Sequence, residues 1–107
     1  MKPRLSEATW QSQVRGLART LGYELQYHTW TSIHSASGFP DLVLVRPADH
    51  PKGFRLVFIE CKAESRQPTA EQWWWLAELQ QGGYEAWLVR PSDWEELARI
   101  LQEEVRK

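Results

Sequence analysis

Two short apolar runs rich in β-branched residues lie close together in the first half of the chain. The first covers residues 39–46 and the second covers residues 54–62. Between them, residues 47–53 form a polar segment that contains two prolines and one glycine. Apolar runs that are bounded by turn-forming residues are typical of adjacent strands. The pattern therefore predicts an antiparallel hairpin.

A helical pattern precedes this hairpin. Ser6 is the predicted N-cap, Glu7 lies in the first turn, where the helix dipole favours an acid, and Gly22 ends the helix. Residues 23–28 alternate and predict a strand, and residues 29–38 predict a polar loop. The residues that recur at helical spacing, and that we expect to pack on a sheet, are Trp10, Val14, Leu17, Ala18 and Leu21.

A second helix, a fourth strand and a last helix follow the hairpin. The second helix is predicted to start at Thr69 and to end at Gly82, and residues 84–89 predict the strand. Ser92 and Glu95 have the spacing of a capping box, so the last helix is predicted to begin there. Its apolar face comprises Trp94, Leu97, Ala98, Leu101 and Val105.

Three consecutive tryptophans, Trp73, Trp74 and Trp75, occupy the second helix. Successive helical residues fan out by about 100°, so three in a row cannot all face one sheet. Trp75 makes the most coherent buried stripe with Leu76 and Leu79. Trp73 or Trp74 is therefore expected at the surface, as a subunit contact, as a stacking surface for DNA, or partly covered by a neighbouring loop.

Charged residues lie at the open end of the predicted hairpin. If the hairpin closes symmetrically around His50 and Pro51, Asp41 lies opposite Glu60, with Cβ atoms about 5 Å apart. Glu60 and Lys62 share a face because side chains alternate along a strand. Two carboxylates so close repel each other, and a divalent cation would offset that repulsion.

These residues suit a Mg²⁺ or Mn²⁺ site. Hard cations take oxygen ligands, commonly one or two carboxylates with waters and substrate phosphate oxygens. The candidate metal ligands are Asp41, Glu60 and the backbone carbonyl of Cys61. Lys62 is placed to hold a water nucleophile or to neutralise charge on a phosphate. Together these groups predict phosphodiester hydrolysis.

The ordered residues resemble a known signature. Pro40-Asp41, followed after eighteen residues by Glu60-Cys61-Lys62, resembles the PD-(D/E)xK nuclease motif. Two short motifs beside it resemble those of the VRR-Nuc family. They are Gly38-Phe39-Pro40-Asp41 on the first strand and Pro68-x-x-x-Gln72 at the next helix. The likeness runs from Ser6 to Leu101.

The resemblance implies an α/β fold of the restriction-endonuclease-like kind, in a single domain over residues 1–107. It has an αβββαβ core with a mixed four-stranded sheet flanked by helices, the site on the two central strands, and an extra C-terminal helix. It also implies a Mg²⁺- or Mn²⁺-dependent DNA endonuclease that leaves a 5′-phosphate. Family members that stand alone occur in phages and are associated with branched DNA, especially Holliday junctions. Because a junction has two-fold symmetry, a homodimer with two sites is expected.

The resemblance gives two further residues a place at the site. Gln72 is expected to orient water or phosphate, although it also has the spacing of a capping box with Thr69, which uses the same side chain. Glu7 is expected near the metal, with Gln11 as its neighbour. The alternative for Glu7 is an ordinary first-turn acid that interacts with the helix dipole.

Contacts with DNA phosphates are expected from the polar loop and from one arginine. The candidates are His34, Ser35, Ser37 and Arg66, whose side chains suit phosphate oxygens. Residues 1–66 carry nine Lys or Arg and six acids, whereas residues 67–107 carry four and eight, which gives +3 and −4. This split is consistent with a DNA-facing side and an acidic back, or with two solvated faces that bind nothing.

The composition excludes some kinds of site and some classes of protein. The single cysteine, Cys61, excludes an internal disulfide and a multi-cysteine zinc site, and we expect it in the core. No apolar run approaches a membrane span and no signal-peptide pattern is present, so a cytosolic protein is expected, in the host cell if a phage encodes it. Three alternatives stay open: a monomeric DNA nickase or flap nuclease, a non-catalytic DNA-binding or assembly subunit, and a protein-interaction module that uses the Trp-rich helix.

Overall fold

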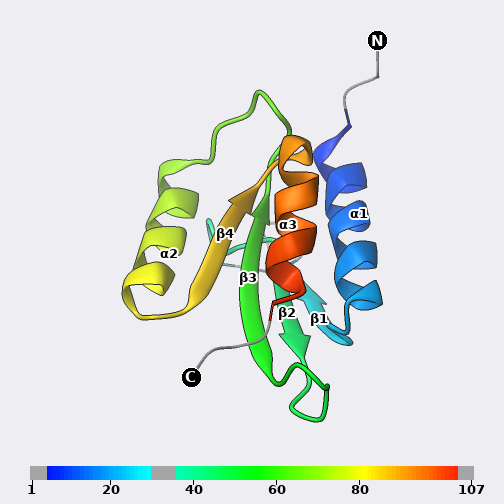
Figure 1. The fold of residues 1–107 in the computed structure, drawn as a ribbon. Coiled ribbons are helices and arrows are strands. Elements are labelled where there is room, and N and C mark those ends of the chain that lie inside the picture. The colour runs from blue at the N-terminus through cyan, green and yellow to red at the C-terminus, as the bar shows by residue number, and fades with distance from the viewer. Residues whose placement is uncertain (1–4, 30–35, 104–107) are drawn as a thin grey trace.

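A computed structural model describes residues 5–29 and 36–103 of the chain. Four strands form one sheet in the order β1-β2-β3-β4, and Figure 1 views the sheet with α1 and α3 in front. The strands are β1 (Leu25–His28), β2 (Leu42–Arg46), β3 (Arg55–Cys61) and β4 (Glu85–Val89). The helices are α1 (Glu7–Thr20), α2 (Ala70–Gln81), the short 3₁₀ helix η1 (Pro91–Asp93) and α3 (Trp94–Leu101). No helix within the described ranges is long and apolar enough to cross a membrane.

The hairpin of β2 and β3 has the predicted register. Leu42 pairs with Ile59 and Arg46 pairs with Arg55, so the pairs are symmetric about the centre of the connecting turn. β1 joins β2 in an antiparallel manner, whereas β4 joins β3 in parallel after the crossover through α2. The predicted mixed four-stranded sheet is therefore confirmed, and the two strands that carry the candidate site are central. Its first three strands form an antiparallel meander.

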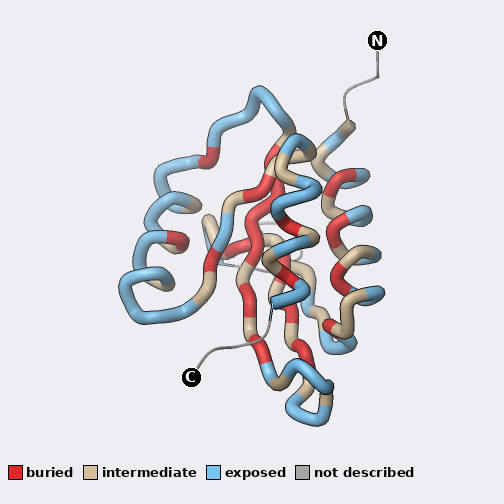
Figure 2. The backbone as a smooth tube through the Cα atoms, in the orientation of Figure 1, coloured by how far each residue is buried: buried red, intermediate tan, exposed pale blue. Residues whose placement is uncertain are grey.

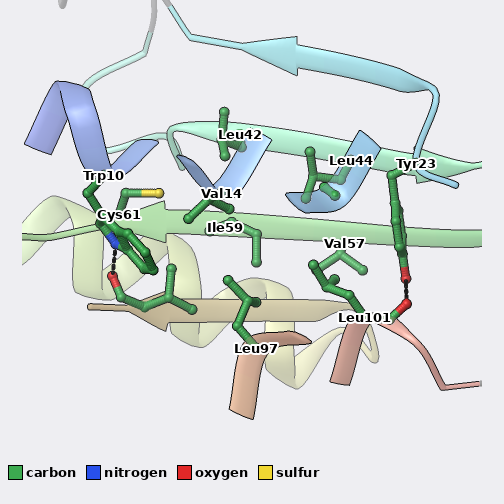
Figure 3. Close-up of a cluster of buried hydrophobic side chains, with 12 residues drawn as sticks. Trp10, Val14, Tyr23, Leu42, Leu44, Val57, Ile59, Cys61, Leu97 and Leu101 are labelled. Carbon is green, nitrogen blue, oxygen red and sulfur yellow. Dashed lines mark hydrogen bonds between the residues drawn. The ribbon is translucent and has the colours of Figure 1, made fainter. Parts of the chain in front are cut away.

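The apolar core lies between the sheet and the helices α1 and α3. Figure 2 shows buried residues along the central strands and on the side of α1 that faces them. Trp10 donates from Nε1 to the carbonyl of Val89 at 3.0 Å, and the Tyr23 hydroxyl donates to the carbonyl of Leu101 at 2.9 Å (Figure 3). These two bonds satisfy the polar atoms of large core residues and tie distant segments together. The predicted α1 stripe is confirmed, and Cys61 lies in the same core.

α2 packs on the opposite face of the sheet. Its Trp75 ring meets Phe39, which in turn meets Phe58, a residue that points away from the α1 and α3 side of β3. Leu76 is buried, whereas Trp74 is 69% exposed. Trp73 is 47% exposed, so the predicted division of the three tryptophans is confirmed. The crossover thus places the N-terminal end of α2 near the segment that leads into β2.

Two buried arginines, which the sequence pattern did not single out, hold the C-terminal end of α3. Arg46, 0% exposed, donates from Nη1 to the carbonyls of Leu101 and Glu103, at 3.4 Å and 3.0 Å. Its neighbour Arg55 pairs with Glu85, with Nε 2.8 Å from Oε2, and also donates to a carbonyl of α3. The last carbonyls of a helix lack partners inside the helix and favour cations. The carbonyls and Glu85 offset the repulsion between two directly paired arginines.

The start of the last helix differs from the prediction. Ser92 does not form a capping box with Glu95, because its N–H and its hydroxyl both donate to the carboxylate of Glu64. Asp93 instead accepts from the backbone N–H of Arg90 at 2.8 Å, which closes the 3₁₀ turn. The predicted cap was wrong because Glu64, distant in sequence, competes for the same serine. The regular helix begins only at Trp94.

Arg46→Met is expected to lower the free energy of unfolding by about 2–4 kcal/mol, because four wholly or partly buried carbonyls lose the guanidinium as a donor. The control is Arg99→Met, which removes an arginine that is paired with Glu96 and Glu103 on the exposed side of α3. That change is expected to cost less than about 1 kcal/mol, since exposed ion pairs are weak. Urea unfolding followed by circular dichroism measures both. Equal losses for the two variants would contradict the proposed role of Arg46.

Candidate active site

Asp41 lies immediately before β2, at the open end of the hairpin. Its carboxylate Oδ2 accepts from the backbone N–H of Cys61 at 2.9 Å, and its carbonyl accepts from the N–H of Thr29 at 2.8 Å. The side chain is therefore fixed by β3 and the backbone by the segment after β1. One carboxylate oxygen, Oδ1, is left for another partner.

Glu60 lies opposite Asp41. The pairing of β2 with β3 begins with Leu42 and Ile59, and Asp41 and Glu60 are the next residues along the two chains. The N–H of Lys62 donates to the carbonyl of Val89, so the backbones of Lys62 and Glu60 face β4 and not β2. Asp41 and Glu60 are consequently a non-hydrogen-bonded pair, the kind in which Cα atoms approach to about 4.5 Å and side chains lie closest. The two acids that the sequence places together are therefore together in the fold.

Glu60 is a buried carboxylate without a donor. It is 1% exposed, and neither carboxylate oxygen accepts a hydrogen bond from any part of the chain that the structure describes. Burial, followed by the charge of Asp41, raises the pKa of the Glu60 carboxyl to about 8. Burial also raises the pKa of Asp41, although the Cys61 N–H and the Lys62 charge lower it in part. A pair of acids in this state attracts any positive charge that can reach it.

Lys62 follows β3 directly and carries the nearest positive charge. Its ammonium Nζ lies 3.7 Å from Glu60 Oε2 and 3.9 Å from Glu7 Oε2, and its side chain is 8% exposed. Because its backbone N–H donates to Val89, the residue is anchored to β4. When Asp41, Glu60 and Glu7 are all ionised, one lysine with two long ion pairs only partly offsets their charge.

Glu7 reaches this group of residues from the first turn of α1. Besides Lys62, its carboxylate meets Arg66, with Oε1 3.5 Å from Nε. Ser6 caps the helix as predicted, by accepting from the N–H of Thr9, which fixes the position of the first turn. In this arrangement Glu7 binds two cationic side chains, and its role as a metal ligand stays a prediction.

Gln72 lies at the start of α2 and forms the predicted capping box. Its Oε1 accepts from the N–H of Thr69 at 2.8 Å, and its own N–H donates to the Thr69 hydroxyl at 3.2 Å. The cap uses the oxygen of the amide and leaves the NH₂ group for a second partner. The role of Gln72 in orienting water or phosphate stays a prediction.

The turn before Asp41 is pressed against α2. Gly38 has φ +85°, and a Cβ built on it would lie 2.6 Å from the backbone of Glu71 and 2.8 Å from the nitrogen of Gln72. Only glycine permits such a close approach in this conformation. The contact between Phe39 and Trp75, with ring centroids 5.0 Å apart, fixes the same junction. Gly38 and Phe39 belong to the motif that resembles the family, but nothing in the sequence pattern predicted their contact with α2.

The predicted DNA contacts are only partly within the described residues. His34 and Ser35 lie outside them. Ser37 is exposed, and its carbonyl accepts from Trp75 Nε1 at 3.0 Å. Arg66 has a side chain that is 68% exposed and lies beside the acidic pair through Glu7.

The residues present fit a hard divalent cation. Glu60 offers two buried oxygens that accept no hydrogen bond within residues 5–29 and 36–103, and Asp41 offers Oδ1. The N–H of Cys61 points toward Asp41, and in a strand the carbonyl of the same residue points to the same side. In the described parts of the chain, no group of three or more His, Cys, Asp or Glu side chains is arranged to bind a metal. Two carboxylates and one carbonyl, with waters completing the shell, are a donor set typical of Mg²⁺.

The order and pairing of the elements, with two acids and a lysine at the open end of the central hairpin, define an α/β protein of the restriction-endonuclease-like class. The profile of a family described as "VRR-NUC domain" matches residues 12–93. The chain belongs to this family, which indicates a nuclease-type role in DNA processing.

A solved structure supports the fold. The protein described as "VRR_NUC domain protein" is similar to this chain with a TM-score of 0.68 and 20% sequence identity. The similarity covers 98% of this chain and 91% of the other. A search of curated proteins found no match.

Gly38→Ala is expected to lower the free energy of unfolding by about 2 kcal/mol more than Gly53→Ala. Both glycines have positive φ, but a Cβ at Gly53 would meet no atom of the described residues within 4 Å, whereas one at Gly38 collides with α2. The difference between the variants therefore isolates the close approach from the backbone strain. Chemical denaturation measures it, and equal destabilisation would show that α2 does not press on this turn.

Glu60→Gln is expected to stabilise the metal-free protein by about 1–3 kcal/mol at pH 8, because it removes a buried charge that faces Asp41. The ordinary pKa of this carboxyl is 4.5 and the folded pKa is about 8, so the folded state binds more protons between these values. Wild-type stability therefore falls as pH rises through that window, and the advantage of Glu60→Gln grows with it. Urea unfolding in EDTA at pH 5 and pH 8 measures the effect.

The control for this experiment is Glu95→Gln, which changes an exposed acid on α3. It is expected to shift stability by less than about 0.5 kcal/mol at either pH. A Glu60→Gln variant that is less stable than the wild type at pH 8 in EDTA would contradict the interpretation of Glu60 as an uncompensated buried acid.

Proposed function

We propose that the protein is a metal-dependent, structure-selective DNA endonuclease that hydrolyses phosphodiester bonds in branched DNA such as Holliday junctions. The observation that supports this most strongly is the carboxylate of Glu60, which is buried against Asp41 and accepts no hydrogen bond from the residues that the structure describes. Such a group is costly to the fold unless a cation binds it. Membership of the family supplies DNA as the substrate class.

The proposed metal ligands are Asp41, Glu60 and the carbonyl of Cys61, with Glu7 as a further candidate. A bound Mg²⁺ or Mn²⁺ supplies Lewis-acid activation of the phosphate and of a water. Asp41 is held for this role by the Cys61 N–H, which leaves its second oxygen available. Glu60 is held by burial and by its ion pair with Lys62, and the strand register keeps it opposite Asp41.

Lys62 is the proposed residue that positions the water and stabilises charge on the phosphate. Its ammonium group lies between Glu60 and Glu7, so it can donate to a water or a phosphate oxygen without moving far. Gln72 supports it by presenting its NH₂ group while its oxygen caps α2. The group lost from the phosphodiester leaves as a 3′-hydroxyl, and the 5′-phosphate stays with the other product.

DNA is proposed to lie along the side of the molecule built from the first two thirds of the chain, where positive residues exceed acids. Arg66 is exposed beside the acidic pair and is suited to a phosphate contact, as are His34, Ser35 and Ser37. These side chains contact backbone phosphates and not base edges, which favours recognition of shape over sequence. A homodimer would place its two sites symmetrically about the two-fold axis of a junction.

The test incubates the full chain with an end-labelled four-way junction and with a matched linear duplex, in Mg²⁺, Mn²⁺ and EDTA. We expect metal-dependent cutting of the junction, and a loss of about 100-fold or more in Lys62→Ala and Asp41→Asn. The control is Lys52→Ala, a lysine at the hairpin turn whose Nζ donates to the carbonyl of Gln102, far from the site. It is expected to cut at the wild-type rate.

Each other outcome points to an alternative. Single nicks without symmetric pairs of cuts would favour a monomeric nickase or flap nuclease over the homodimer. Tight junction binding without cutting in any metal would overturn the catalytic proposal and favour a DNA-binding or assembly subunit. Dimerisation without any salt-dependent DNA affinity would favour a protein-interaction module.

A further inference from the structure

The second helix carries an aromatic surface that the nuclease proposal does not use. A cavity of about 440 Å³ opens on α2 and is lined, among the described residues, by Trp74, Trp75 and Glu78. Trp74 is 69% exposed, a high value for the most costly side chain to leave in water. An exposed tryptophan at the mouth of a cavity is a common feature of recognition sites.

The walls of this cavity are held in place. Trp75 donates from Nε1 to the carbonyl of Ser37 at 3.0 Å, and its ring packs edge-on against Phe39. Trp74 Nε1 lies 3.4 Å from Glu78 Oε1, one helical turn away. The carboxylate therefore sits at the edge of the exposed indole, and its second oxygen is left for another donor.

The negative charge of α2 favours a cationic ligand over DNA. α2 carries Glu71 and Glu78 and contains no Lys or Arg. A DNA strand that stacked a base on Trp74 would bring phosphates toward Glu78 with no cation from this helix to offset the repulsion. A cationic side chain would instead be attracted by the faces of the indoles and by the carboxylate at the same time.

We propose that the cavity formed by Trp74, Trp75 and Glu78 is a docking site for an arginine-bearing segment of a partner polypeptide. The guanidinium stacks on the Trp74 indole and donates to Glu78, an arrangement that its planar, forked donors favour over the point charge of lysine. One wall of the cavity adjoins the segment that leads into the candidate active site, because Trp75 contacts Phe39, two residues before Asp41. The inference goes beyond the proposed nuclease function and does not depend on it.

The test titrates the full ¹⁵N-labelled chain with the peptide acetyl-Gly-Arg-Gly-amide and follows the indole N–H signals by NMR. The chain has seven tryptophans, so the signal of Trp74 is assigned by its absence in Trp74→Phe. We expect saturable shifts of the Trp74 and Trp75 signals. We also expect the affinity to fall about five-fold or more in Trp74→Ala and in Glu78→Gln.

Two probes and one variant serve as controls. The peptide with citrulline in place of arginine has the same shape without the charge and is expected to cause no shift. Glu95→Gln, on the exposed side of α3, is expected to bind as the wild type does. Equal shifts with citrulline, no shift with arginine, or unchanged affinity in Glu78→Gln would each overturn the proposal. Shifts of the same two signals by single-stranded oligothymidylate, with none from the arginine peptide, would identify a DNA-stacking surface instead.

Discussion

The repulsion between Asp41 and Glu60 is the constraint around which the open end of the hairpin is built. The strand register holds the two acids together, since the pairs from Leu42 and Ile59 to Arg46 and Arg55 leave no other partner for them. Burial makes their charge expensive, and Lys62 offsets it only in part. The packing of the fold therefore holds together two acids that repel each other, and a metal cation would offset that repulsion. Such a loss of stability at a site is a common relation between stability and function.

Local patterns were enough to predict this end of the molecule. The length of the segment between two apolar runs fixed a symmetric hairpin, and alternation along the strands then placed Asp41, Glu60 and Lys62. The same holds for α1 and for the caps at Ser6 and Thr69, because their partners lie within three residues. Interactions between residues that are close in sequence can therefore be predicted from sequence patterns.

Interactions between distant segments were not predictable in this way. Ser92 binds Glu64 across 28 positions, which overrides a capping pattern that is locally sound. Arg46 and Arg55 look like ordinary strand ends, and their partners become visible only when α3 has folded back over the sheet. The site role of Gln72 is ambiguous for a related reason: its spacing serves the cap and the site equally, and only the cap can be recognised from local sequence.

The position of the two buried arginines has a wider consequence. They lie at the turn end of the hairpin, at the opposite end of the same strands from Asp41 and Glu60. The hairpin therefore carries the two arginines that hold the last helix at one end and the two acids of the candidate site at the other. Substitutions that strengthen the contacts of the arginines with the last helix can therefore accumulate without disturbing the acids. An engineer who wants a more heat-resistant protein, or a lineage under thermal selection, has positions to change that lie a strand's length from the candidate site.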